Sequence, residues 1–375
     1  MSRRFLLAAL ALVAATALPW IAPSPRAAAQ AQIQALAPYA LTAYSRPDRA
    51  APIVGVFTPH AKVALEGRSA DAAWVLGHST DGSVRGWIER RYLLLPPDAS
   101  VARLLVSNEI LFAPPDASRT DSAPIAVDLT SYPVMPVGMG RARAIYESGR
   151  ILGMNARSVA KVGDCISDNQ HFLSPFGQGR YNLGEFAHLQ GVIDHFGASL
   201  ALDSLAAYDG LVTSAVLDPT FANPLACQPG ESPLRCEYRV HRPSVAVIMF
   251  GAQDLLFTPA EQFERNLRRI VHETIQAGVI PLLSTFPGNL ALWEQSVRYN
   301  QIVVRVALDY EVPLMNLWLA LEALPNHGLN EDGRHLSLPY TDSGDLAPAN
   351  LQRGYPLRNL VTLQALDAVW RGAMQ

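Results

Sequence analysis

The amino-acid sequence predicts an α/β domain built on a mainly parallel sheet, preceded by a small all-β module. From about residue 139 onward, apolar strand-like runs alternate with amphipathic helical segments. This alternation is typical of βαβ units, whose parallel sheet is covered by helices on both faces. Residues 33–96 instead show short apolar runs separated by turn residues, without a helical period. The chain of 375 residues is long enough for both units.

The overall composition is that of a folded protein without a strongly charged surface. Hydrophobic residues make up 49% of the chain and charged residues 17%, which leaves ample apolar material for a packed core. The formal net charge is −3, so nucleic acid is not an expected partner. The sequence shows neither a glycine-rich phosphate loop nor a cluster of metal ligands, and we therefore expect no cofactor and no metal.

The N-terminus has the features of a targeting segment. Arg3 and Arg4 precede an apolar stretch, residues 5–18, that is too short to span a bilayer comfortably. Three alanines at 27–29 offer a cleavage site. We expect residues 1–29 to be a signal peptide and the mature protein to be secreted or held in the cell envelope, without a stable membrane span. The alternative, an uncleaved anchor, is disfavoured by the prolines that follow the apolar stretch.

The chain has three cysteines, and export would allow two of them to pair. Cys227 and Cys236 bracket a turn-rich loop. A disulfide between them would stabilise the fold by about 2–3 kcal/mol. This pairing leaves Cys165 as a single thiol, which is unusual in an exported protein and marks it for attention.

The N-terminal module consists of short alternating runs. Apolar residues alternate at 53–57 and 61–65, a strand follows at Trp74, and Gly86-Trp87-Ile88 closes the series. Over about sixty residues this order resembles the bacterial SH3-like (SH3b) module. The resemblance implies a small all-β barrel, and such modules often bind cell-wall peptides. Trp74 and Trp87 are therefore candidate ligand contacts. The alternative is that both fill the core of the small barrel.

Between the two units, residues 97–138 are rich in Pro, Asp, Ser and Thr and are expected to form a linker that packs partly against a domain. In the large domain, residues 244–250 form a continuous apolar run, as expected of a central parallel strand buried on both faces. The other strands are expected at 158–162, 279–285 and 312–317, and the helices at 141–152, 182–196, 260–277, 292–310 and 351–374.

Three short polar motifs fall at the predicted strand ends, where parallel α/β sheets carry their sites. They are Gly163-Asp164-Cys165, Gly251-Ala252-Gln253-Asp254 and Asp332-Gly333-Arg334-His335. In this order they resemble the motifs of the SGNH (GDSL-like) hydrolase family, and the resemblance spans residues 139–375. It implies a flavodoxin-like three-layer domain with a parallel sheet. It also implies hydrolysis of an ester of a small molecule or a glycan.

Carried over position by position, the resemblance places Cys165 where the family has its nucleophilic serine. His335 falls on the base and Asp332 on the acid. Gln253 falls on the asparagine that donates to the oxyanion, and Gly210 is the candidate for a backbone donor to the same oxygen. Acyl transfer needs these parts: a nucleophile, a base that takes its proton, a group that orients the base, and donors for the developing charge.

Two departures from the family pattern leave the activity open. Cys165 replaces serine, and Gln253 places its amide one methylene further out than asparagine would. A thiol has a pKa of about 8.5, and we expect a neighbouring imidazolium or a helix N-terminus to lower it. The first hypothesis is therefore an acyl-ester or thioester hydrolase with a cysteine nucleophile. The second is a catalytically inactive pseudo-hydrolase that binds cell-envelope glycan or peptide. A redox-sensing thiol ranks last, because no resolving cysteine is evident.

The remaining polar residues near the motifs have expected structural roles. Asp164 and Asp254 are expected to orient their turns. Ser167, two residues after Cys165, could be proposed as a substitute nucleophile, but on a turn its side chain is expected to point elsewhere. The pockets that select the substrate are expected to be formed chiefly by the loops at 177–181 and 338–350.

Overall fold

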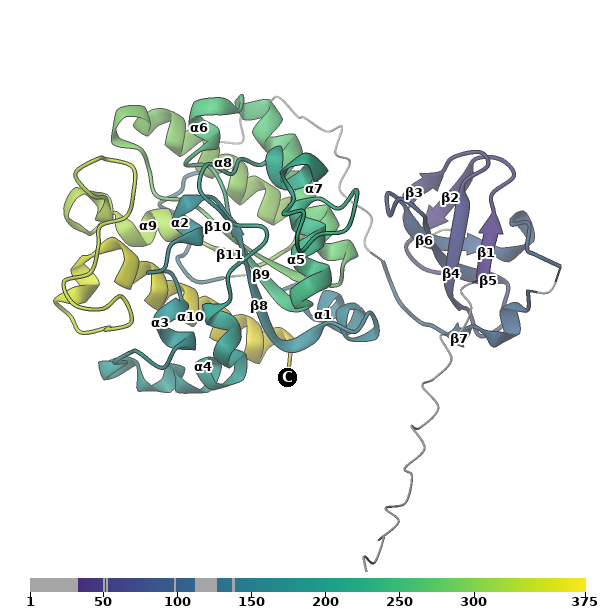
Figure 1. The fold of residues 1–375 in the computed structure, drawn as a ribbon, viewed down its shortest axis with the longest axis horizontal. Coiled ribbons are helices and arrows are strands. Elements are labelled where there is room, and N and C mark those ends of the chain that lie inside the picture. Colours follow the sequence, from purple (N-terminus) through teal and green to yellow (C-terminus); the bar gives the residue numbers. More distant parts are fainter. Residues whose placement is uncertain (1–32, 50, 52, 98, 112–126, 137–138) are drawn as a thin grey trace, which may run out of the picture.

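The computed structural model describes residues 33–49, 51, 53–97, 99–111, 127–136 and 139–375 (Figure 1). The predicted signal peptide, residues 1–29, lies outside the described residues. Within them, no helix has the length and apolar character needed to cross a membrane.

The N-terminal module is all-β, as its turn-rich pattern predicts. Its strands are β1 (Ile33–Leu36), β2 (Leu41–Tyr44), β3 (Ile53–Phe57), β4 (Lys62–Arg68), β5 (Trp74–Ser79), β6 (Arg85–Glu89) and β7 (Leu105–Val106). They form one sheet in the order β1-β4-β5-β6-β2-β3, with antiparallel pairing along this path. β7, which lies in the segment after residue 96, adds to β4 in parallel.

The two tryptophans of the module have different environments. Trp87 is fully buried, and its indole N–H donates to the Glu109 carbonyl at 2.8 Å. It therefore fills the core of the all-β module and does not face a ligand, which is the second of the two roles that the sequence left open. Trp74 is half-buried, with its ring edge-on to Tyr44 at 5.5 Å between ring centres. Its role as a ligand contact remains a prediction.

The large domain is built on a parallel sheet. Its strands are β8 (Asn155–Gly163), β9 (Pro243–Met249), β10 (Ile280–Ser284) and β11 (Leu314–Met315), in the spatial order β8-β9-β10-β11. Beyond β8, Ala207 forms a parallel bridge to Gly163, so that a reduced strand lies at this edge. Counted in chain order, the strands are arranged 2-1-3-4-5, the order of flavodoxin-like sheets. The connection reverses between β8 and β9, and a site is expected at that switch point.

Helices cover both faces of this sheet, which gives three layers (Figure 1). Those of the domain are α1 (Ala142–Ile151), α2 (Cys165–Asp168), α3 (Ser174–Gly177), α4 (Gln190–Phe196), α5 (Pro233–His241), α6 (Asp254–Phe257), α7 (Ala260–Gln276), α8 (Trp293–Tyr310), α9 (Leu317–Leu321) and α10 (Gly354–Ala373). α1 and α4 pack with α10 on one face, and α7 packs with α8 on the other, near α5.

The expected elements of the domain are present, with three differences. The helix expected at 182–196 is divided into a 3-10 segment, Gly184–Leu189, and α4. The last strand is only two residues long, because Asn316 caps α9 immediately after it. The helix α5 was not predicted. Ser232 caps it and Pro233 occupies its first turn, two signals that mark a helix start.

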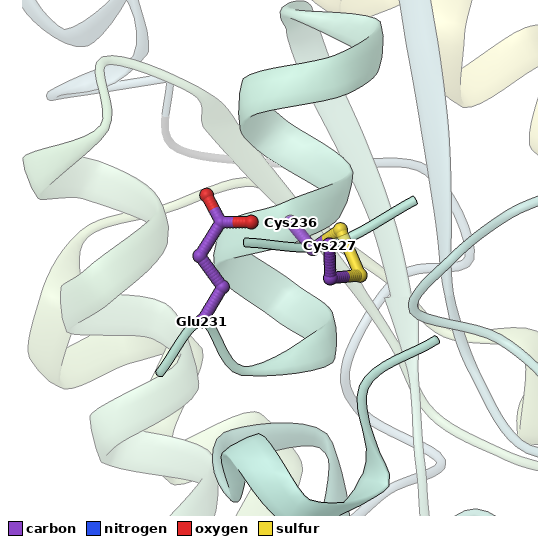
Figure 2. Close-up of side chains that lie close together, drawn as sticks. All are labelled: Cys227, Glu231 and Cys236. Carbon is purple, nitrogen blue, oxygen red and sulfur yellow. A yellow bond between two sulfur atoms is a disulfide. The ribbon is translucent and has the colours of Figure 1, made fainter. Parts of the chain in front are cut away.

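A disulfide joins Cys227 to Cys236, as the sequence predicts (Figure 2). Cys236 lies on α5 and is buried, so the bond ties the preceding loop to this helix. Glu231, close to the disulfide in Figure 2, accepts hydrogen bonds from Arg239. Among the described residues these two cysteines and Glu231 are the one group close enough to hold a metal ion. The disulfide occupies both sulfurs, so they are not available as thiolate ligands.

Candidate active site

Two of the predicted site residues meet because β8 and β9 are parallel neighbours. Cys165 begins α2 directly after β8, and Gln253 follows β9 and precedes α6. Both strands end at the same edge of the sheet, which brings the two side chains together. The Gln253 amide nitrogen Nε2 lies 3.8 Å from the Cys165 Sγ atom.

His335 and Asp332 reach the same place from the loop before α10. The His335 Nε2 atom lies 3.4 Å from Cys165 Sγ, and its Nδ1 atom lies 2.6 Å from Asp332 Oδ2. The other carboxylate oxygen of Asp332 accepts the backbone N–H groups of Arg334 and His335, each at 3.0 Å. Gly333 supports the tight turn with a positive φ of 69°. The structure thus joins Cys165, His335 and Asp332 in one chain of contacts.

These contacts determine which nitrogen of His335 can take a proton from Cys165. Burial alone would raise the pKa of Asp332, but the hydrogen bonds from His335 and from two backbone N–H groups outweigh it and lower the pKa. Asp332 is therefore a carboxylate at neutral pH and accepts a hydrogen bond from the Nδ1–H group of His335. This assigns the lone pair of neutral His335 to Nε2, which faces the thiol. His335 is placed to act as a base toward Cys165.

The electrostatic environment of the thiol differs from the expectation. Burial, followed by the nearby charge of Asp164, raises the pKa of Cys165 to about 11. The predicted lowering of the thiol pKa is therefore wrong. The half-buried sulfur loses hydration, and the carboxylates of Asp164 and Asp209 repel a thiolate more than Arg334 and Gln253 favour it. Cys165 is a protonated thiol at neutral pH and needs a base to become a nucleophile.

The two predicted oxyanion donors lie on opposite sides of β8. Gln253 is buried, with 6% of its surface exposed, and its amide points at the sulfur. Gly210 lies in a turn in which the Leu211 N–H donates to the Tyr208 carbonyl, with a φ of 79° at the glycine. This turn follows Ala207 at the edge of β8. The role of Gly210 as a donor remains a prediction.

The segment that carries Gly210 is held by a network that the sequence reasoning missed. Asp254, fully buried, accepts the backbone N–H of Thr213 at 3.1 Å and its hydroxyl at 2.6 Å. Asn266 donates to the same hydroxyl at 3.1 Å. The predicted structural role of Asp254 is confirmed, and its partner is a loop that is 41 residues away in the sequence. The network links the end of β9 to the turn beside Cys165.

Arg358 is a second residue that the sequence reasoning missed. It lies on α10 and is fully buried beneath α2. Its guanidinium donates to the Ile166 carbonyl at 2.6 Å and to the Ser167 hydroxyl at 3.0 Å, and it lies over the Phe172 ring at 3.5 Å. It thereby holds the turn that carries Cys165. The sequence did contain a signal for such a residue. Polar residues occur on the buried face of an otherwise apolar helix, where they need polar partners inside the domain.

Two further residues of the turn that carries Cys165 have the expected roles. Ser167 is 1% exposed and its hydroxyl is bound by Arg358, so it is not placed to replace Cys165. Asp164 accepts the backbone N–H of Ile166 at 3.1 Å and so orients the turn. Burial raises the pKa of Asp164 to about 6, although the charge of Arg358 opposes this shift.

The two loops expected to select the substrate are joined to each other. Asn182, next to the first loop, donates its backbone N–H to the Gly344 carbonyl and accepts the N–H of Leu346. Arg180 forms an ion pair with Asp342. The two loops are therefore bound to each other, and Gly344 packs against the Arg180 backbone so closely that a side chain there would clash.

No protein-family model matches this chain, and no curated protein matches it. Among solved structures it is similar to a putative lipolytic protein of the G-D-S-L family from Desulfitobacterium hafniense, with 12% identity, 56% of this chain and 99% of that chain covered, and a TM-score of 0.38. A lipase/acylhydrolase from Enterococcus faecalis is 18% identical over 57% of this chain and 96% of its own, with a TM-score of 0.37. A catalytic mutant of an acetylxylan esterase from Geobacillus stearothermophilus is 16% identical over 57% of this chain and 94% of its own, with a TM-score of 0.36.

All three similar proteins are described as lipolytic enzymes, acylhydrolases or esterases. With identities below 25% and TM-scores below 0.5, this likeness carries no conclusion about the chemistry at Cys165.

Proposed function

We propose that this protein is a hydrolase of the SGNH type that cleaves acyl esters or thioesters, with Cys165 as its nucleophile. The observation that carries the proposal is the continuous chain of contacts from Asp332 through His335 to Cys165, at 2.6 and 3.4 Å. A nucleophile, a base and a group that orients the base are the parts that acyl transfer requires.

In the proposed reaction, the Cys165 sulfur attacks the carbonyl carbon of the substrate while His335 Nε2 takes the thiol proton. The negative charge that develops on the carbonyl oxygen is met by the backbone N–H of Cys165, the Gln253 amide and the Gly210 N–H. When the tetrahedral intermediate collapses, the bond to the leaving alcohol or thiol breaks and His335 returns its proton to that group. Water, deprotonated by His335, then hydrolyses the acyl-cysteine and regenerates the thiol.

The raised pKa of Cys165 decides how this site can work. With a pKa of about 11, the thiolate fraction at neutral pH is very small, so a preformed thiolate is not the reactive species. Proton transfer to His335 must accompany the attack. In this respect the site resembles a serine hydrolase, in which the base takes the proton during the attack. It differs from a cysteine protease that holds a stable thiolate–imidazolium ion pair.

A second candidate function is binding without turnover, and one observation favours it. The Gln253 amide points at the Cys165 sulfur from 3.8 Å, so that it contacts the resting thiol as well as the space for an oxyanion. A donor that is directed at the resting sulfur must turn away from it before it can stabilise an oxyanion, which makes it a poorer preorganised donor. In this case the protein would be a pseudo-hydrolase. The site around Cys165 would hold a cell-envelope glycan or peptide, assisted by the SH3-like module.

We infer that the protein works outside the cytoplasm, where the proposed signal peptide would take it. The disulfide between Cys227 and Cys236 supports this location, because such bonds persist in oxidising compartments. An SH3-like module with Trp74 as its ligand contact would fit a role at the cell wall.

A single assay distinguishes the hydrolase from the pseudo-hydrolase. Mature protein is incubated with a chromogenic acetyl ester and with its thioester analogue, beside Cys165→Ala and Cys165→Ser. The hydrolase proposal expects turnover by the wild type and none by the alanine variant, and the ester-to-thioester ratio begins to define the substrate. Silent wild type with active Cys165→Ser would instead support the pseudo-hydrolase.

A further inference from the structure

A cleft lies between the N-terminal module and the large domain, away from Cys165. It has a volume of about 620 Å³, within the range of about 300–1,000 Å³ that is usual for small-molecule sites, which often form between domains. From the module, Glu66, His78 and Arg85 line it. From the domain, α5 and the last two turns of α7 line it. These helices lie on the side of the domain that faces the module (Figure 1).

Hydrogen bonds hold the two walls of this cleft together. Arg85 is paired with Glu109 through both of its terminal nitrogens, at 2.6 and 2.8 Å. Ser148 of α1 donates to the same Glu109 carboxylate at 2.6 Å. On the other side, Arg235 of α5 donates to the Asp81 carbonyl at 2.9 Å. The cleft is therefore framed by contacts that cross from the module to the domain at two places.

One end of the cleft carries an excess of positive charge. The Glu273 carboxylate is shared by two arginines, Arg269 at 2.8 Å and Arg235 at 2.9 Å. Two guanidinium groups against one carboxylate leave one positive charge unbalanced in this cluster. Within the described part of the chain, Arg269 makes a single hydrogen bond, from Nε to Glu273, so its terminal nitrogens remain able to bind an anion.

One of the residues that line the cleft, Gln276, has a polar side-chain atom without a hydrogen-bond partner among the described residues. This atom, Oε1, is buried. A buried acceptor without a donor costs about 1–3 kcal/mol, so a turn of the half-buried Gln276 side chain that brings Oε1 to a ligand N–H or O–H in the cleft would be favoured. His272 lines the cleft near Gln276, and burial lowers its pKa, so its ring is neutral at neutral pH. Leu152, Met154 and Leu234 supply apolar surface beside these groups.

We propose that this cleft binds a small organic anion that has an apolar body and at least one N–H or O–H donor. The anionic group is held by Arg269 and Arg235, the donor is accepted by Gln276 Oε1, and the apolar body lies against Leu152 and Met154. The requirement for all three features excludes bare phosphate or sulfate as the intended ligand.

This site is separate from the candidate active site. Met154 immediately precedes β8, and Cys165 follows the other end of that strand. Nine residues of β8 at about 3.3 Å each place the two sites roughly 25–30 Å apart. Binding at the cleft and acylation of Cys165 can therefore be measured independently, and the proposal does not depend on hydrolase activity.

The test uses full-length mature protein and the fluorescent probe anilinonaphthalene sulfonate (ANS), which combines an aromatic body, a sulfonate and one N–H donor. Fluorescence titrations compare the wild type with Arg269→Ala and Gln276→Leu. The matched control is Arg265→Ala, an exposed arginine on the same helix that does not line the cleft. Each titration is repeated after alkylation of Cys165.

We expect saturable binding of one ANS molecule that each cleft variant weakens by about three- to tenfold, while Arg265→Ala and alkylation leave it unchanged. The proposal would be overturned by the absence of saturable binding, by equal affinity in both cleft variants and the wild type, or by loss of binding when Cys165 is alkylated. Tighter binding by Gln276→Leu would also contradict it, because the amide would then not accept the donor.

Discussion

His335 Nε2 lies 3.4 Å from Cys165 Sγ, although the two residues are 170 positions apart in the sequence. The contact exists because β8 ends at Cys165 and the loop before α10 crosses the same edge of the sheet. The contact places a base, His335, beside a half-buried thiol whose pKa is raised.

The base and its orienting carboxylate should be needed for turnover. His335→Ala should lower kcat for acetyl esters by at least about a hundredfold, because His335 is the one imidazole in contact with the thiol among the described residues. Asp332→Asn should lower kcat by a comparable factor or more, because an amide stabilises the wrong tautomer of His335. His188→Ala is the matched control, since His188 is exposed. Steady-state kinetics measure all three, and full activity in His335→Ala would contradict the assignment.

The thiol should react slowly at neutral pH. A pKa of about 11 means that the rate of alkylation by iodoacetamide should rise with pH through pH 8 without a plateau. At pH 8 the thiolate fraction should be about a hundredfold lower than for an ordinary cysteine, which the unfolded protein in urea provides as the reference. Mass spectrometry of the alkylated protein gives the rates. A plateau near neutral pH would show a stable thiolate instead.

Arg358 should support both the fold and the nucleophile turn. Arg358→Met should lower the free energy of unfolding by about 3–5 kcal/mol, because it leaves the Asp164 charge and the Ile166 carbonyl buried without their partner. Arg371→Met, on the exposed face of the same helix, should change it by less than about 1 kcal/mol. Urea unfolding measures both. Equal effects of the two substitutions would argue against a special role for Arg358.

Asp164 should make stability depend on pH. Its folded-state pKa of about 6 is raised above the ordinary 3.8, so its stabilising contribution is complete below pH 3.8 and is lost as pH rises through 6. The loss amounts to about 3 kcal/mol. Asp164→Asn keeps an acceptor for the Ile166 N–H but does not titrate. Between pH 4 and pH 7 the variant should therefore gain stability relative to the wild type, and a constant difference would refute the raised pKa.

The disulfide should stabilise the domain without entering the chemistry. Replacing Cys227 and Cys236 together by serine should lower the free energy of unfolding by about 2–3 kcal/mol. The ratio of ester to thioester turnover should not change, because the bond lies on α5 and does not contact Cys165. Calorimetry and kinetics on the double variant check the two parts separately.

Much of the site could be predicted because sheet topology is encoded locally. A continuous apolar run followed by Gly-Ala-Gln-Asp predicts a buried parallel strand with Gln253 at its end, and this is where the structure has it. The close spacing of Asp332 and His335 predicts only that both can reach one site, and their pairing is what the family resemblance implies. In the same way, the disulfide could be expected from two cysteines around a turn-rich loop.

The remaining features depend on contacts that sequence spacing does not reveal. The thiol pKa was predicted in the wrong direction because burial of Cys165 and the proximity of Asp209 arise only from packing. Arg358 reaches the nucleophile turn across more than 190 residues, so local patterns could not assign its partner. Likewise, the strand at Ala207 is reduced to a single bridge and has no apolar run to mark it.

The most direct test of the account is whether an acyl group forms on Cys165. Mature wild type is mixed with an acetyl ester or thioester, quenched in acid, and analysed by intact mass and peptide mapping, beside Cys165→Ala and His335→Ala. We predict an acetyl adduct on the Cys165 peptide of the wild type that forms and decays at the rate of turnover, is absent from Cys165→Ala, and forms far more slowly in His335→Ala. Turnover that persists in Cys165→Ala, or a wild type that forms no adduct and releases no product, would contradict a cysteine-nucleophile hydrolase.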